Sequence, residues 1–72
     1  MIHIGKLIKE KMVERGMTVV LMAKYLSCSR GNVYKIFDKY SIDTESLMKI
    51  SKVLDFDFFG LYSEYLKSSS DK

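Results

Sequence analysis

The sequence has one cysteine and one histidine, and this scarcity excludes two kinds of small scaffold. Cys28 has no partner within the chain for a disulfide bond. Together with His3 it cannot supply the three or four ligands of a zinc site. We therefore expect no metal, no other cofactor and a reducing, intracellular setting, and the fold has to depend on an apolar core.

Long apolar runs are also absent. The first residues, "MIHIGKLIKEK", carry charges inside the apolar pattern, so we expect neither a signal peptide nor a membrane span, and a cytoplasmic location. No set of nucleophile, base and orienting residue can be assembled, and there is no glycine-rich phosphate loop. A chain of 72 residues also hides too little surface for a deep catalytic pocket. These absences argue against an enzyme.

What the chain does contain is an apolar fraction of 47%, enough for a packed core, and an uneven charge. Residues 1–40 hold eight Lys and Arg against three acids, a balance of +5. Residues 41–72 hold four against six, a balance of −2, which gives the net charge of +3. A polyanion is therefore expected to bind the N-terminal half.

Helical spacing dominates the sequence. Apolar residues recur three and four apart, and no alternating run indicates a strand, so we predict an all-α domain over residues 1–66. The polar tail, 67–72, is expected to be disordered. The five expected helices cover roughly 4–15, 19–26, 30–37, 44–54 and 58–66.

Local signals mark the ends of these helices. Gly16 is expected to end the first one, because glycine adopts the left-handed conformation easily. The side chains expected to cap the other four are Thr18, Ser29, Asp43 and Asp57. The residues expected to face the core are Ile4, Leu7, Ile8, Met12, Met22, Ala23, Leu26, Val33, Ile36, Leu47, Ile50, Val53, Leu54, Phe58, Leu61 and Tyr62, with Val13 as a further candidate.

The second and third helices are short and only three residues separate them. This spacing is typical of a helix-turn-helix motif, whose second helix can lie in the major groove of DNA while the first braces it. Ala23 is expected to face the turn, where a larger side chain would push the helices apart, and Cys28 to be a small apolar plug beneath it. Val33 and Ile36 would then hold the third helix on the core.

The span "MTVVLMAKYLSCSRGNVYKI", with "IGKLIKEK" before it and "SLMKISKVLDFDFFGLY" after it, resembles the lambda-repressor/Cro-like (Xre-type) helix-turn-helix regulators over roughly residues 4–62. The resemblance implies a compact five-helix lambda-repressor-like domain with the motif at about 19–38. It also implies a prokaryotic or phage transcriptional regulator, acting as a repressor, that binds double-stranded DNA and needs no small-molecule ligand.

The resemblance also implies a binding surface. Arg30 and Lys35 are candidates for base edges, because both side chains can donate to guanine O6 and N7. The other residues expected to face DNA are Ser29, Gly31, Asn32 and Tyr34, with Thr18, Lys39 and Tyr40 as further contacts to the backbone. Two alternatives remain open: a merely solvated face for Arg30 and Lys35, and a half-buried core position for Tyr34.

Three positions depart from the family pattern. Ser27 stands where the family usually has a turn glycine, so a side chain must adopt a costlier conformation. Val19 stands where the family often has a glutamine that contacts phosphate, so the resemblance does not extend to that contact. Met12 and Phe37 occupy the positions of an Arg and Glu ion pair, which predicts that these two apolar side chains touch.

The C-terminal helix carries more aromatic side chains than a core this small can bury. One hypothesis is that Phe59, Tyr62 and Tyr65 form a homodimer interface. The alternative is that some close the core and the rest lie singly on the surface. A rival function also follows from this helix: a protein-interaction module of the same fold, antitoxin-like or an adaptor.

Overall fold

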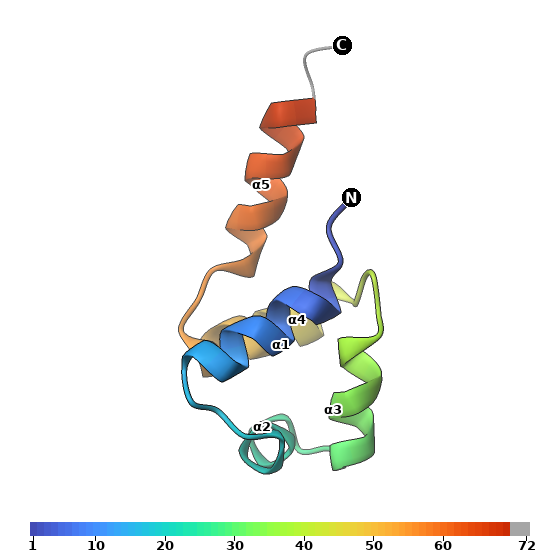
Figure 1. Cartoon of the computed structure of the whole chain (residues 1–72), viewed down its shortest axis with the longest axis vertical. Helices are drawn as coiled ribbons and strands as arrows, with labels where there is room; N and C mark the ends of the chain where they lie inside the picture. The colour runs from blue at the N-terminus through green and yellow to red at the C-terminus, as the bar shows by residue number, and fades with distance from the viewer. Residues whose placement is uncertain (70–72) are drawn as a thin grey trace.

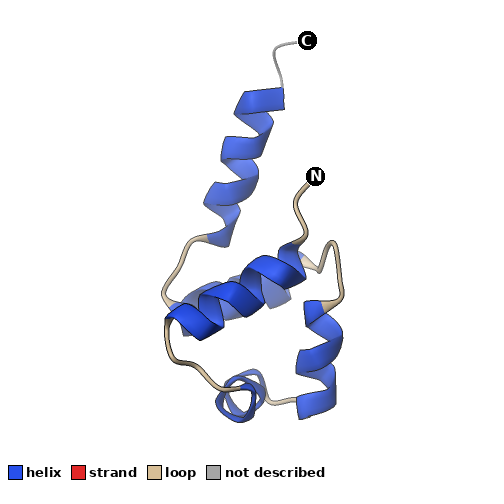
Figure 2. Cartoon of the chain, in the orientation of Figure 1, coloured by secondary structure: helices blue, strands red, loops and turns tan. Residues whose placement is uncertain are grey.

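Residues 1–69 of the computed structural model are described, and they form helices joined by short loops (Figures 1 and 2). No strand occurs among these residues, so the predicted all-α class is confirmed. The helices are α1 (Ile4–Glu14), α2 (Val19–Leu26), α3 (Arg30–Phe37), α4 (Thr44–Leu54) and α5 (Phe58–Ser69).

The helices begin at side chains that accept a hydrogen bond from a backbone N–H one turn later, which satisfies a donor that has no partner within the helix. All four predicted caps do this: Thr18 to Leu21 N at 3.1 Å, Ser29 to Asn32 N at 3.2 Å, Asp43 to Ser46 N at 2.9 Å and Asp57 to Gly60 N at 3.1 Å. The cap of α1 was not predicted. It is His3, whose Nδ1 accepts from Lys6 N at 3.1 Å.

Three residues with positive φ follow helix ends. Gly16 has φ 70°, as expected for the residue that stops α1. Ser27 has φ 55° and ψ 46°, so the predicted costly conformation in the turn is confirmed. Asp55, with φ 52°, ends α4 in the same way, although nothing in the sequence analysis pointed to it.

The core lies between α1, α2, α3 and α4, with the first residue of α5 closing it. Its fully or almost fully buried side chains are Ile4, Ile8, Met12, Met22, Ala23, Val33, Leu47, Ile50, Leu54 and Phe58. The other residues predicted to face inward are half-buried against this cluster. Val13 is a correction: it is 74% exposed, because the buried stripe of α1 follows residues 4, 8 and 12 and leaves residue 13 on the solvent side.

Backbone hydrogen bonds connect the N-terminus of α1 to the loop that follows α3. The first backbone N–H groups of α1 donate to the loop after α3, Ile4 N to Tyr40 O at 3.3 Å and Gly5 N to Lys39 O at 2.9 Å. Gly5 is buried here, and a Cβ on it would collide with the carbonyl oxygen of Ile36. A glycine is therefore needed where the two helices meet.

Helix α5 projects from the body formed by the other four helices (Figure 1), and the principal extents are 42, 20 and 20 Å. Phe58 is completely buried, whereas Leu66, two turns later, is 66% exposed. The helix runs to Ser69, three residues beyond the predicted bound, because no glycine or proline interrupts it after Leu66. The tail expected from residue 67 thus begins as helix, and 70–72 lie outside the described residues.

Candidate nucleic-acid interface

Helices α2 and α3 are connected by Ser27, Cys28 and Ser29. The turn is held by a backbone hydrogen bond from Cys28 N to Ala23 O at 2.9 Å. Ala23 is buried, in agreement with the prediction that a small residue is needed beside the turn. Cys28 is half-buried rather than fully enclosed. The left-handed conformation of Ser27 then lets Ser29 cap the next helix.

Helix α3 has one face on the core and one in solvent. Val33 is 1% exposed, and Ile36 and Phe37 are half-buried against the core. All six residues predicted to face DNA are exposed, and we call them the α3 surface: Ser29, Arg30, Gly31, Asn32, Tyr34 and Lys35. Tyr34 is 58% exposed, which decides against a core position for its side chain.

The α3 surface carries positive charge without acidic neighbours on the same helix. The helix has no Asp or Glu, and Asp38 follows only at its C-terminal cap. Neither Arg30 nor Lys35 forms an ion pair with any residue of the described part of the chain. Both cations are therefore available to an external anion.

Two carboxyl groups in residues 1–69 have lowered pKa values, and neither lies on α3. The pKa of Glu14 is lowered mainly by the hydrogen bond from Lys11, whose Nζ is 2.9 Å from Oε1. The pKa of Asp43 is lowered chiefly by its hydrogen bonds with Ser46 at the start of α4, and to a smaller degree by the charge of Lys39. These carboxylates stabilise local structure, and they leave the charge of α3 unpaired.

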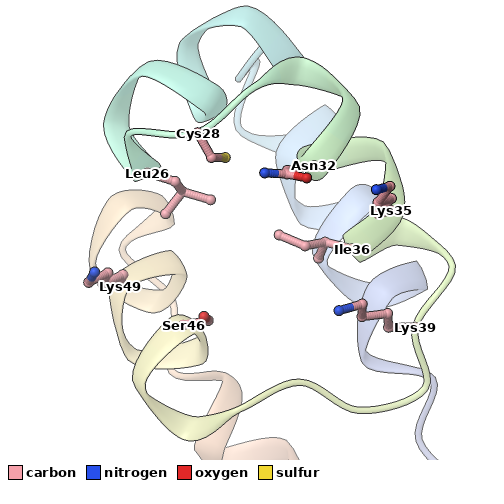
Figure 3. A pocket seen from close by; sticks show the side chains of 8 residues that line it. All are labelled: Leu26, Cys28, Asn32, Lys35, Ile36, Lys39, Ser46 and Lys49. Atoms are coloured by element: carbon pink, nitrogen blue, oxygen red, sulfur yellow. The ribbon is translucent and has the colours of Figure 1, made fainter.

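A hollow of about 240 Å³ lies beside the α3 surface, between α3 and α4 (Figure 3). Asn32 and Lys35 line it from α3, and Lys39 from the loop that follows. Ser46 and Lys49 line it from α4. These last two residues were not predicted from the sequence, because Lys49 is fourteen positions from Lys35 and only the packing of α4 brings it to the same hollow.

The remaining predicted contacts lie in different places. Thr18 is exposed, with its hydroxyl engaged as the cap of α2. Lys39 is exposed at the hollow. The ring of Tyr40 lies 4.2 Å from that of His3 and lines a second hollow with Tyr62, near α5 rather than beside α3.

Phe37 packs against the core cluster that includes Met12. Its ring centroid is 5.8 Å from Nζ of Lys9, one turn before Met12 on α1, and 5.9 Å from the ring of Tyr34. The direct contact between Met12 and Phe37 stays a prediction.

The three aromatic residues of the dimer hypothesis lie on α5. Phe59 is 38% exposed and Tyr65 43% exposed, whereas Tyr62 is half-buried. Phe59 and Tyr62 line a shallow hollow with Ile42, and Tyr62 and Tyr65 line another with Ile2. Apolar surface is thus exposed along the base of this projecting helix.

Other kinds of site have little support in the part of the chain described. Within residues 1–69, no three His, Cys, Asp or Glu side chains lie close enough together to hold a metal ion. None of the helices there has the length and apolar character needed to cross a membrane. No family model, curated protein or solved structure matches the chain. What it does must therefore be argued from its own surface.

Proposed function

We propose that the chain is a sequence-specific double-stranded DNA-binding protein of the helix-turn-helix class, with a lambda-repressor-like fold. One observation carries this proposal: α3 presents an exposed, acid-free surface with two unpaired cations, while its other face is held by the core. A short helix of this kind can enter the major groove of DNA, which is about 12 Å wide.

In this proposal α3 lies in the groove and α2 braces it across the DNA backbone. Arg30 and Lys35 donate to acceptors on base edges and read sequence. Ser29, Asn32 and Tyr34 bind phosphate oxygens and set the register. Gly31 lets the backbone of α3 approach the DNA closely, because it adds no side chain between its neighbours.

The biological role that we propose is that of a cytoplasmic transcriptional repressor that occupies a promoter as a homodimer. The exposed aromatic side chains at the base of α5 support the dimer. Two copies would present two recognition helices to half-sites about one turn of DNA apart. The role is one of binding, without catalysis.

The test is selection of binding sites from random duplex DNA with the purified protein, followed by affinity measurements on the selected site. Arg30→Ala and Lys35→Ala should each weaken binding by about 1–3 kcal/mol, or roughly 5- to 150-fold. The matched control is Lys52→Ala, which removes an exposed charge from α4 away from the α3 surface and should change affinity little.

Affinity should also fall steeply with salt concentration, because binding releases counterions from the phosphates. Weak binding that is insensitive to both substitutions and to salt would contradict the proposal. That result would favour the second candidate, a protein-interaction module in which α5 binds a partner through exposed apolar residues such as Phe59 and Leu66.

A further inference from the structure

The hollow between α3 and α4 is lined by both apolar and polar side chains. Leu26 and Ile36 are among the apolar side chains. The polar side chains, which we call the rim, are those of Asn32, Lys35, Lys39, Ser46 and Lys49, and they come from α3, the following loop and α4. Its volume of about 240 Å³ is far more than the about 10–15 Å³ that one water molecule needs. The space is large enough for a small polyatomic ligand.

The charge around this rim is positive. None of its three lysines forms an ion pair within residues 1–69. The carboxylate of Asp43 is close enough to Lys39 to have its pKa lowered slightly by that charge, but it already accepts the backbone N–H of Ser46. Like charges that share a hollow repel each other, and an anion between them removes that repulsion.

The neutral groups on the rim can also donate hydrogen bonds. The side chain of Asn32 makes no hydrogen bond to the described part of the protein, whereas the side chain of Ser46 is hydrogen-bonded to Asp43. Figure 3 shows Asn32 and Lys39 on one side of the hollow and Ser46 on the other, with Lys49 at its outer edge. An amide and ammonium groups together match a ligand made of acceptor oxygens.

We propose that this hollow binds a phosphate group. The phosphate belongs to the DNA backbone or to a free phosphorylated molecule, and the chemistry of recognition is the same. The first source rests on the proposed function, whereas the second does not. Because Asn32 and Lys35 also belong to the α3 surface, a free phosphate here would compete with DNA and would make the protein responsive to a small molecule.

The first experiment uses inorganic pyrophosphate and the full chain. In an NMR titration at constant ionic strength, with chloride as the reference, the backbone amides of Asn32, Ser46 and Lys49 should shift and saturate. Lys49→Ala should weaken pyrophosphate binding at least about fivefold. Lys52→Ala makes the same change of charge on the same helix outside the hollow, and it should have no such effect.

The second experiment measures binding of the selected duplex at several salt concentrations. If a backbone phosphate occupies the hollow, Lys49→Ala should reduce the slope of log affinity against log salt by about 1, and Lys52→Ala should not. Ser46→Leu provides an independent variant, because it fills the hollow with an apolar side chain and retains the backbone N–H that donates to the α4 cap residue Asp43.

The two experiments separate the sources of the phosphate. If Lys49→Ala weakens binding of DNA alone, the ligand of the hollow is a backbone phosphate. If it weakens binding of pyrophosphate alone, the ligand is a free phosphorylated molecule. If it weakens both, DNA and the free ligand compete for the hollow. If folded Lys49→Ala and Ser46→Leu proteins bind pyrophosphate and DNA like the Lys52→Ala control, the phosphate site is overturned. If the chain binds no DNA at all, the proposed function fails, and the pyrophosphate titration alone decides this site.

Discussion

At the scale of single residues, Ser27 is a non-glycine residue in a turn position that favours glycine. Its φ of 55° is left-handed, a conformation that costs a residue with a Cβ about 1 kcal/mol more than it costs glycine. We expect Ser27→Gly to raise the free energy of unfolding by up to about 1 kcal/mol, measured by urea denaturation. As a control, Ser63→Gly in the middle of α5 should lower it, since glycine is a poor helix former.

Gly31 is a position where one substitution should change stability and DNA binding in opposite directions. At about 100° per residue it lies in the middle of the exposed arc of α3, and a Cβ there would meet only Ser29 Oγ at 3.7 Å. Gly31→Ala should therefore stabilise the fold by about 0.5 kcal/mol. If α3 enters the groove, the same change should weaken DNA binding at least about fivefold. Unchanged affinity in a more stable protein would contradict close approach at this position.

At the scale of elements, the junction of α1 and α3 depends on Gly5. A Cβ there would collide with the backbone carbonyl oxygen of Ile36, which cannot move without shifting the end of α3. Gly5→Ala should destabilise the protein by about 1–3 kcal/mol or more, as overpacking does, and should lower the temperature of thermal unfolding. Gly31→Ala is the matched control, since the same methyl group is added in open space and the predicted sign is opposite.

At the scale of the whole molecule, the projecting α5 is the element through which we propose that copies of the chain associate. If its aromatic residues form a homodimer interface, sedimentation should show a dimer, and Phe59→Arg should shift it towards monomer by burying a charge in an apolar contact. Val13→Arg introduces the same charge at an exposed apolar residue of α1 and should leave the mass unchanged. A monomer at high concentration, both free and on DNA, would contradict the dimer.

The sequence predicted local features well and distant ones incompletely. The cap residue Asp43 was predicted because its hydrogen bond reaches only three residues along the chain. Val13 was wrongly included among inward candidates, since spacing alone does not fix the edge of a buried stripe. His3 was missed as a cap, and the position of its neighbour Tyr40 near α5 depends on how the loop after α3 returns to α1.

The sequence by itself determined the number of helices, the starts of α2, α3, α4 and α5, and the residues at the centre of each apolar stripe. These properties depend on caps, on backbone conformations and on side-chain spacings within about four residues. The tertiary structure decided that α1 must carry Gly5 against α3, that α5 leaves the body, and that Ser46 and Lys49 border a hollow beside α3. The physical reason is that these features arise from contacts between helices far apart in the chain, and such contacts exist only once the core has packed.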